Sequence, residues 1–438
     1  MKIVFLTPGT GSYYCGACMR DNTLARELIR VGHEVTITPM YLPLILDEDA
    51  AGGREDIPVF FGGINVYLQQ KLALFRRTPA FVDRLLNAPG LLCWAARHSH
   101  MTSAREHGEM TLEMLRVGSS RLRKEFDKLL RWLEDAEKPD VVCLSNALLA
   151  GFAAELKRRL RVPVVLFFQG EDSFLDGLPE PYLTGCWTEL TRLLPDSDVL
   201  ISPSRFYADF MRARLDLAPN AIEVIPNGID LAGFSAGEPP SVPTIGFLAR
   251  MSRDKGLEVL IDAFLVLAGQ LGDRSTRLGI AGAATAGDQP LIARLQQRLA
   301  AAGLSGRVDW KPNLTRAHKI TFLRSLTLLS VPAVYAEAFG LYVVEAMACG
   351  VPVVQPAAAA FPEIIEATGG GICVPPRDAA ALARAWQTLL ADPTGRARLA
   401  RAARSGVETF YGAATMGGEF CRVIARTLGA GVNPVPSP

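Results

Sequence analysis

Short runs rich in valine, isoleucine and leucine recur along the first half of the chain, and segments with helical spacing separate them. These runs are Lys2 to Leu6, Glu34 to Pro39, Val141 to Leu144, Val164 to Phe168 and Val199 to Ser202. Near-continuous apolar runs of this length are typical of strands buried on both faces, and their alternation with helices indicates a parallel sheet. We therefore expect an α/β domain in this half.

The same rhythm returns in the second half of the chain. The apolar runs there are Thr244 to Leu248, Leu278 to Ala281, Val308 to Trp310, Leu328 to Val331 and Val351 to Val354. A length of 438 residues also suits two domains of about 200 residues better than a single core. The pattern predicts two Rossmann-like βαβ domains that face each other across a cleft.

Proline and glycine clusters separate the two sets of runs. Ile225-Pro-Asn-Gly-Ile-Asp230 is followed by a stretch that ends in Gly237-Glu-Pro-Pro-Ser-Val-Pro243, and such clusters interrupt both helices and strands. We place an N-terminal domain at residues 1–235 and a C-terminal domain at residues 236–410. We expect residues 411–438 to form a helix that crosses back to the N-terminal domain, followed by a tail.

A mostly helical insertion at about residues 69–137 breaks the rhythm of the first half. Its segment 114–132 carries six basic side chains against only Glu125 and Asp127, interleaved with apolar positions. Such a helix can lie on an anionic membrane or hold an anionic acceptor. The alternative, which the frequency of solvated charged faces favours, is a helix that packs its apolar side on its own domain.

Composition and charge exclude several classes of protein. Forty-six Lys and Arg balance 45 Asp and Glu, and a net charge of +1 provides no field that would attract nucleic acid. The eight cysteines are scattered through apolar stretches, which indicates a reducing compartment rather than a disulfide framework. The first apolar run is too short for a signal peptide, and no run is long enough to span a membrane. We expect a cytoplasmic protein, with any membrane contact peripheral and at the inner face.

Two glutamates stand eight positions apart in Val334-Tyr-Ala-Glu-Ala-Phe-Gly-Leu-Tyr-Val-Val-Glu-Ala-Met-Ala-Cys-Gly350. Glu337 lies in a loop after a strand, and the segment Ala338-Phe-Gly-Leu341 opens a helix whose free amides form an anion site. Glu345 lies further along that helix among apolar residues, where a carboxylate is costly unless it has a partner. The alternative is a helix-terminal acid followed by a stray surface acid. The pair suits carboxylates that accept hydrogen bonds from hydroxyls at the two ends of one elongated ligand.

Two basic residues follow the first strand of the second half. Arg250 and Lys255 lie in the loop of Gly246-Phe-Leu-Ala-Arg-Met-Ser-Arg-Asp-Lys-Gly256, just before a helix. Two cations in a loop are more often surface residues, but a strand–loop–helix setting favours phosphate binding. If no metal takes part, such cations would neutralise the charge that develops on a leaving diphosphate.

A glycine-rich turn follows the first strand. In Pro8-Gly-Thr-Gly-Ser-Tyr-Tyr14, Gly9, Gly11 and Ser12 let the backbone approach a phosphate or sugar closely, although simple packing explains such a turn equally well. The turn lacks the spacing of the dinucleotide fingerprint, which argues against a nicotinamide enzyme.

These motifs together resemble the GT-B glycosyltransferases, and among them the large retaining family 4. The resemblance rests on Ile225-Pro-Asn-Gly-Ile-Asp230 with Phe234, the Gly246 to Gly256 block, Leu278-Gly-Ile-Ala-Gly282, the two-glutamate motif, Phe361-Pro-Glu-Ile-Ile365 and Gly369-Gly-Gly-Ile-Cys-Val374. It implies that Arg250 and Lys255 bind a donor diphosphate, that Glu337 holds the transferred sugar and that Glu345 holds the ribose. It further implies that Gly340 and Leu341 present backbone amides to the donor.

The N-terminal half, which binds the acceptor in such enzymes, departs from the family pattern. Where the family often has His followed by Gly or Asp, this chain has Gln169-Gly-Glu-Asp172, and a glutamine cannot shuttle a proton near neutral pH. We place Gln169, Glu171 and Asp172 on the acceptor side, although surface acids at a strand end are the more ordinary interpretation of the last two. Cys15 and Cys18 lie at the start of the first helix as acceptor-side or structural thiols, with a redox pair or half of a metal site as alternatives.

The sequence thus predicts a glycosyltransferase that moves a sugar from a nucleoside diphosphate sugar to a glycan, lipid-linked or small-molecule acceptor. The resemblance implies a retaining reaction, and the residues suggest that neither a metal nor another cofactor is needed, with Arg250, Lys255 and Glu337 as the catalytic candidates. One alternative is a nucleoside diphosphate sugar 2-epimerase, which needs no acceptor. Another, suggested by Gln169 and the two cysteines, is a regulatory module that binds nucleotide without turnover.

Overall fold

Contacts in the computed structural model divide the chain into two compact units. Unit 1 comprises Met1–Pro203, Ala208–Ile225 and Met416–Pro438, and unit 2 comprises Ser204–Tyr207 and Pro226–Thr415. Within these ranges the structure describes residues 1–9, 16–42, 44, 46, 48–52, 59–61, 104–238 and 240–429. The divisions at 225 and 415 lie close to the boundaries of 235 and 410 expected from the sequence.

Unit 1 contains a six-stranded parallel sheet in the order β2-β1-β3-β4-β5-β6. Its strands are β1 (Lys2–Thr7), β2 (Glu34–Pro39), β3 (Val141–Leu144), β4 (Val164–Phe167), β5 (Val199–Ser202) and β6 (Ile222–Val224). The five expected strands all form. The sixth, β6, was not predicted because it is a short, half-buried edge strand without a distinct apolar run.

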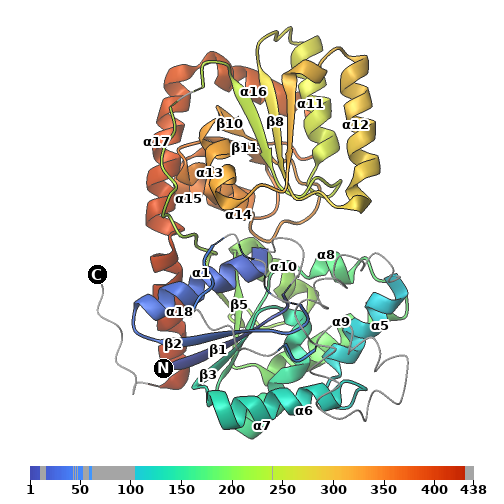
Figure 1. The fold of residues 1–438 in the computed structure, drawn as a ribbon, viewed down its shortest axis with the longest axis vertical. Helices are drawn as coiled ribbons and strands as arrows, with labels where there is room; N and C mark the ends of the chain where they lie inside the picture. Colours follow the sequence, from blue (N-terminus) through green and yellow to red (C-terminus); the bar gives the residue numbers. More distant parts are fainter. Residues whose placement is uncertain are drawn as a thin grey trace. The chain divides into compact units, whose positions relative to one another are not determined.

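Helices cover both faces of this sheet (Figure 1). They are α1 (Gly16–Arg30), α5 (Ala104–Leu115), α6 (Arg123–Trp132), α7 (Ala153–Leu160), α8 (Asp172–Leu175), α9 (Tyr182–Leu193), α10 (Arg205–Arg214) and α18 (Ala413–Leu428). The final helix packs on the sheet, since the Phe420 ring lies 6.3 Å from Phe5 and 6.1 Å from Phe167. The described part of the predicted insertion, 104–137, is mostly helical, with turns at 116–122, whereas residues 69–103 lie outside the described residues.

Unit 2 contains a second six-stranded parallel sheet, in the order β12-β11-β10-β7-β8-β9. Its strands are β7 (Thr244–Leu248), β8 (Arg277–Gly282), β9 (Val308–Pro312), β10 (Leu328–Leu329), β11 (Val353–Pro356) and β12 (Gly371–Val374). With the strands renumbered from β7, this is the strand order of the dinucleotide-binding Rossmann fold. The expectation of two Rossmann-like α/β domains is therefore confirmed.

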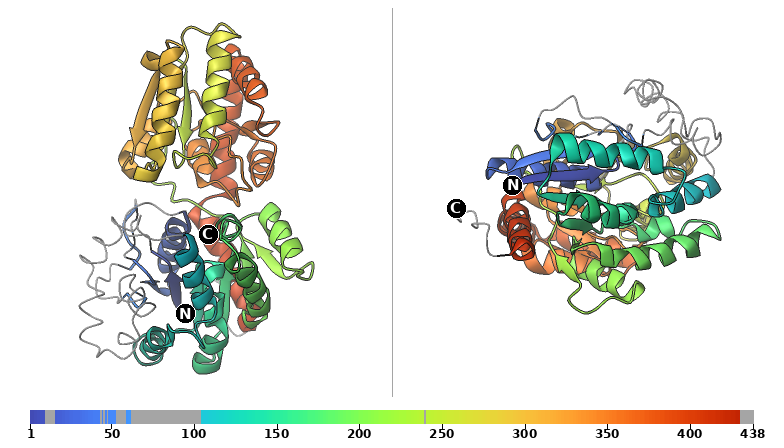
Figure 2. Two further views of the ribbon diagram at one scale, coloured as in Figure 1. Left: turned by 90° about the vertical axis from the view of Figure 1, so that its right-hand side faces the viewer. Right: turned by 90° about the horizontal axis from the view of Figure 1, so that it is seen from below.

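The helices of unit 2 lie on both sides of its strands (Figure 2). They are α11 (Leu257–Gly269), α12 (Gln289–Ala301), α13 (Arg316–Arg324), α14 (Leu341–Ala348), α15 (Phe361–Thr368), α16 (Ala379–Ala391) and α17 (Pro393–Phe410). The core includes Trp386, which is fully buried and donates its indole N–H to Ser330 Oγ at 2.8 Å. Ser330 directly follows β10, so this bond gives the indole N–H, the one polar group of the buried Trp386 side chain, a partner at the end of that strand.

Candidate active site

The direction of strand order in unit 2 reverses between β7 and β10. In open parallel sheets, ligands bind beyond the carboxyl ends of the strands at such a switch point, because the loops from the two strands diverge there. The loop after β7 carries Arg250 and Lys255, and the loop after β10 carries Glu337. The topology thus brings the two strongest sequence motifs to the same edge of one sheet.

These two loops are in direct contact. Val334 N–H donates to Asp254 O at 2.9 Å, and Gly256 follows with a φ of +75°. A Cβ at Gly256 would lie 1.8 Å from Pro332 O, so no larger residue fits there without moving the backbone. Gly256 therefore permits the close approach that places Lys255 against the Glu337 loop.

Lys255 and Glu337 form an ion pair at this edge. Lys255 Nζ lies 2.5 Å from Glu337 Oε2 and 2.5 Å from the hydroxyl of Tyr335. Tyr342 donates its hydroxyl to the same Glu337 oxygen at 2.8 Å. The side chains of Lys255 and Glu337 are 17% and 12% exposed, so both charges are largely shielded yet reachable.

The two tyrosines surround the Lys255 ammonium with aromatic faces. Nζ lies 4.8 Å from the ring centroid of Tyr335 and 5.5 Å from that of Tyr342, within the range of a cation–π attraction. Burial, followed by the charge of Glu337, raises the pKa of Tyr342 well above its usual value, so this phenol stays a hydrogen-bond donor near neutral pH. Sequence reasoning missed both tyrosines, although they lie two residues before and five residues after Glu337.

The helix α14 begins as predicted, immediately after Phe339 and Gly340. Gly340 is the N-cap with a φ of +97°, and no side chain caps the first amides. The buried residues Ala338 and Phe339 lead into this turn, and Ser204 Oγ donates to Ala338 O at 2.6 Å. Leu341 is the first helical residue. Uncapped amides and the positive end of the helix dipole make this terminus a suitable place for a phosphate group.

Glu345 is 6% exposed and has a partner that the sequence did not suggest. Lys319 on α13 places its Nζ 2.5 Å from Glu345 Oε1. The three buried residues of α13 are Lys319, Phe322 and Leu323, so the lysine occupies the i, i+3 and i+4 face that packs inward. A lysine on an otherwise apolar helix face was the available signal for this pair.

Arg250 takes a different position from Lys255. Its side chain is 55% exposed, and Nη2 lies 3.2 Å from Asp254 Oδ1. Another cation, Arg377, donates from Nη2 to Val334 O at 2.8 Å, at the same pair of loops. Lys255 therefore contacts the glutamate directly, whereas the two arginines lie on the solvent side of the loops that carry the pair.

The glycine-rich turn of unit 1 is described only at its start. Gly9 follows β1 with a φ of +71°, and Cys18 is buried in α1. Gly11, Ser12 and Cys15 lie outside the described residues. The predicted roles of this turn and of the Cys15 and Cys18 pair stay predictions.

Unit 1 has a buried ionic cluster at its own switch point, between β1 and β3. Asp21 on α1 accepts hydrogen bonds through Oδ2 from Thr7 at 2.7 Å and from the Ser145 hydroxyl. Arg20 Nη2 lies 3.0 Å from Asp21 Oδ1, in an ion-pair contact without hydrogen-bond alignment, and donates to Ser145 O at 3.1 Å. The guanidinium also lies 3.7 Å from the ring centroid of Phe167. Sequence reasoning did not identify this cluster.

The three acceptor-side candidates of unit 1 occupy distinct environments. Glu171 is 6% exposed, and its two oxygens accept the backbone N–H of Ala147 and of Gln169, each at 2.8 Å. Burial raises the pKa of this carboxyl. Asp172 is also buried at the start of α8, whereas Gln169 is half-buried. Glu171 thus joins the loops that follow β3 and β4.

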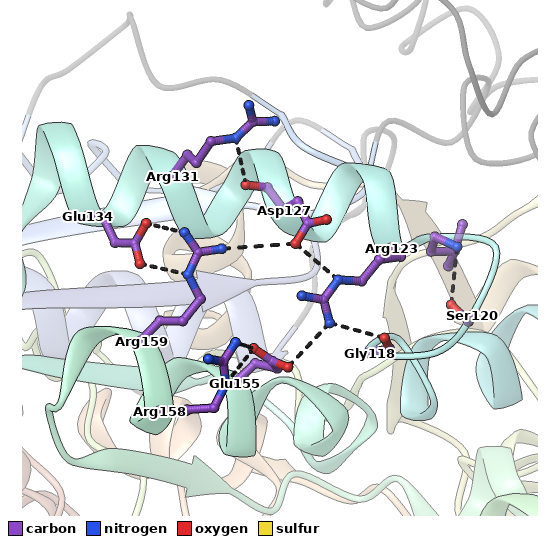
Figure 3. Close-up of polar contacts among 10 residues, drawn as sticks. Gly118, Ser120, Arg123, Asp127, Arg131, Glu134, Glu155, Arg158 and Arg159 are labelled. Carbon is purple, nitrogen blue, oxygen red and sulfur yellow. Dashed lines mark hydrogen bonds and ion pairs between the residues drawn. The ribbon is translucent and has the colours of Figure 1, made fainter.

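Several basic side chains of the segment 114–132 pair with acids of their own unit, and Figure 3 shows the contacts of Arg123. Arg123 contacts Asp127 at 3.0 Å and Glu155 at 3.3 Å, and Arg159 on the neighbouring helix pairs with Glu134. Outside the figure, Arg116 and Arg121 also pair with acids, and Phe126, Leu129 and Leu130 are fully buried. These contacts favour the alternative of a helix packed on its own domain.

The described part of the chain has neither a cluster of metal-binding side chains nor a membrane-spanning helix. No group of three or more His, Cys, Asp and Glu side chains converges there in a way that could hold a metal ion. No described helix is both long enough and apolar enough to cross a membrane.

Two family models match consecutive parts of the chain. Residues 232–406 match the model described as glycosyl transferases group 1, and residues 115–232 match the model of glycosyltransferase family 4. The chain spans about half the length of the curated relatives it matches. The D-inositol 3-phosphate glycosyltransferase of Salinispora tropica, for example, is 30% identical over 239 residues, which are 50% of this chain and 49% of that protein.

Solved structures resemble the chain over almost its whole length. Sucrose-phosphate synthase from Thermosynechococcus elongatus gives a TM-score of 0.73 at 18% identity, covering 98% of this chain and 100% of that chain. The Anabaena protein Alr3699/HepE, solved in complex with UDP-glucose, gives a TM-score of 0.66 at 18% identity, covering 97% of this chain and 100% of that chain. Identity at this level shows the fold alone.

Proposed function

Because this chain belongs to the GT-B glycosyltransferases of the group 1 and family 4 type, we propose that it transfers a sugar from a nucleoside diphosphate sugar to an acceptor. The observation that carries this proposal is the convergence of Lys255, Glu337 and the uncapped start of α14 at the switch point of unit 2. A cation, an acid and free amides at one sheet edge suit a diphosphate attached to a sugar.

The donor is held by unit 2 along α14. The diphosphate lies at the amides of Gly340 and Leu341 with Lys255 beside it, and Arg250 approaches from the exposed loop. Two of the three N–H donors of Lys255 are used by Glu337 and Tyr335, which leaves one for a phosphate oxygen. Glu337 accepts from hydroxyls of the sugar, and Glu345, about one turn further along the helix, accepts from the ribose.

The reaction retains the configuration at the anomeric carbon and needs no metal. The bond from this carbon to the diphosphate oxygen breaks, and its electron pair leaves with the diphosphate. The acceptor hydroxyl oxygen bonds to the same carbon, and its proton passes to the departing phosphate oxygen. Lys255, Arg250 and the helix amides stabilise the negative charge that develops on the leaving group.

The acceptor is held by unit 1, with Gln169 as the side chain that contacts its hydroxyls. Glycan and lipid-linked carriers are the first acceptor classes to test. The buried Glu171 acts on this site through the Gln169 backbone, because one of its oxygens holds that N–H.

Two measurements test the proposal. The first is a thermal-shift screen of UDP, GDP and ADP and their sugars, since a ligand that binds only the folded state raises the melting temperature. The second is release of nucleoside diphosphate by chelator-treated enzyme across a panel of acceptors. We expect Lys255→Ala and Glu345→Ala each to lower turnover by about 100-fold or more. The control Arg277→Ala, at a half-buried position of the same unit where Arg277 pairs with Asp309, should leave turnover unchanged.

The outcomes separate the proposed function from its alternatives. Normal turnover in Lys255→Ala or Glu345→Ala would refute the residue assignments. Conversion of a nucleotide sugar into its epimer without any acceptor would identify a 2-epimerase instead. Tight nucleotide binding with no turnover on any acceptor would indicate a regulatory module.

A further inference from the structure

Lys319 and Glu345 form a largely buried ion pair between α13 and α14. Their charged atoms, Nζ and Oε1, are 2.5 Å apart, and the side chains are only 11% and 7% exposed. Lys319 lies on α13, which precedes β10 in the chain, and Glu345 lies on α14, which follows it. None of the motifs that relate this chain to other glycosyltransferases includes Lys319.

Neither charge suits its position without the other. Every residue of α14 from Tyr342 to Ala348 is buried, so Glu345 emerges from an apolar surface. Lys319 likewise shares its helix face with the buried Phe322 and Leu323. Removal of either partner would leave a charge in surroundings that solvate it poorly. Within the fold, each charge of the pair is therefore balanced by the other.

The pair also orients the carboxylate. The contact with Lys319 falls on Oε1, and within the described residues Glu345 Oε2 makes no hydrogen bond. A carboxylate can accept through both oxygens, so one is used to fix the group and the other is left to receive a hydroxyl. A fixed acceptor discriminates between ligands better than a mobile one, because a missing hydroxyl leaves it unpaired.

We propose that Lys319 is a positioning residue that holds Glu345 so that this carboxylate distinguishes ribose from 2′-deoxyribose in the bound nucleotide. The inference rests on the proposed function, in which Glu345 accepts hydrogen bonds from the ribose hydroxyls. Lys319 does not contact the nucleotide itself; it acts through the direction in which it holds the Glu345 carboxylate.

The test compares the dissociation constants of UDP, ADP and GDP with those of their 2′-deoxy counterparts by isothermal titration calorimetry. For the base that binds best, we expect wild-type protein to prefer the ribonucleotide by about tenfold or more, the range for a hydrogen bond to a charged group. Lys319→Met should reduce this preference to less than about threefold. Lys319→Arg, which keeps a cation beside the carboxylate, should retain most of it.

One further variant serves as a substitute if Lys319→Met does not fold, and another serves as the control. If Lys319→Met fails to fold, Lys319→Gln keeps a hydrogen-bond donor without the charge and should still lower the preference. Lys311→Met replaces an exposed lysine of the same unit and should leave the preference unchanged. Circular dichroism confirms folding of each variant.

The results separate this inference from the function on which it rests. Wild-type protein that binds none of the six nucleotides would overturn the proposed function. Equal binding of ribo and deoxyribo forms by the wild type would overturn the role of Glu345, and the role of Lys319 with it. A wild-type preference that persists in the neutral Lys319 variants would overturn the inference alone. So would an equal weakening of both ligands, which is the result expected of a merely structural ion pair.

Discussion

The switch points of the two sheets use charged residues in opposite ways. In unit 1, between β1 and β3, Arg20 and Asp21 are 1% and 0% exposed, and Asp21 connects Thr7 at the end of one strand to Ser145 after the other. In unit 2, between β7 and β10, Lys255 and Glu337 retain 17% and 12% exposure. The uncapped start of α14 lies beside them.

This difference shows that the same topological position can serve stability or binding. A charge that is completely enclosed must be matched by the protein itself, and its main effect is to fix which strands and loops meet. A charge that keeps some exposure and an unused hydrogen-bond donor can receive a ligand. We therefore expect mutations in unit 1's cluster to act on folding and mutations in unit 2's cluster to act on turnover.

The largest effect on folding should come from Asp21→Asn. Loss of this carboxylate leaves Arg20 as a buried cation without its ion-pair partner, which should lower the free energy of unfolding by about 3–5 kcal/mol. Urea denaturation followed by circular dichroism measures it. In the control Glu34→Gln, which removes a partly exposed pair with Lys2, the change should stay below about 1 kcal/mol. Equal effects of the two substitutions would remove the contrast between buried and exposed charges.

Glu337→Gln should show the reverse pattern. The amide preserves the size of the side chain but loses the charge, so kcat/KM for a nucleotide sugar should fall by about 100-fold or more. The free energy of unfolding should fall by only about 1–2 kcal/mol, because the pair with Lys255 is partly exposed. The exposed Glu366→Gln serves as control and should change neither quantity. A large loss of stability with normal turnover would reverse the roles assigned to the two units.

Tyr342→Phe in unit 2 should have a smaller effect on kcat/KM than Glu337→Gln. The variant removes one hydrogen bond to Glu337, worth about 1 kcal/mol, so kcat/KM should fall about fivefold. Binding of UDP alone should not change, since Glu337 is assigned to the sugar. Tyr335→Phe is the matched comparison, because its hydroxyl accepts from Lys255 instead. Weaker UDP binding in Tyr342→Phe would mean that this phenol acts on the diphosphate.

The smallest predicted effect is a pH dependence in unit 1. Because burial raises the pKa of Glu171 above its value in the unfolded chain, the folded protein takes up this proton first as the pH falls. Ionised Glu171 therefore costs stability near neutral pH, and acidification towards its raised pKa relieves that cost. The unfolding free energy of wild type minus that of Glu171→Gln should increase from pH 7 to pH 5 in urea titrations. A difference that is flat or decreases would show that Glu171 is not destabilised by burial.

Local pattern was sufficient for the regular elements and for one end of the candidate site. The apolar runs identified ten of the twelve strands in the described residues, and the two missed strands, β6 and β12, are short, half-buried edges. The motif around Glu337 correctly predicted where α14 begins, because Gly340 and the apolar residues after it specify a helix start locally. Hydrogen bonding within a helix and side-chain alternation along a strand depend on near neighbours, so both leave a periodic signature.

By itself, then, the sequence determined two Rossmann-like units and placed Lys255 and Glu337 in loops that follow strands, with Glu345 on the helix after Glu337. The strand order of unit 2 brings the two loops to one edge of its sheet. Only the tertiary structure decided which charges meet. Lys319 reaches Glu345 across 26 positions and Asp21 reaches Ser145 across 124, while Arg250, predicted alongside Lys255, remains exposed beside Asp254. Spacing along a chain specifies the face on which a side chain lies, whereas its partner depends on the order of the strands and the packing of the loops between them.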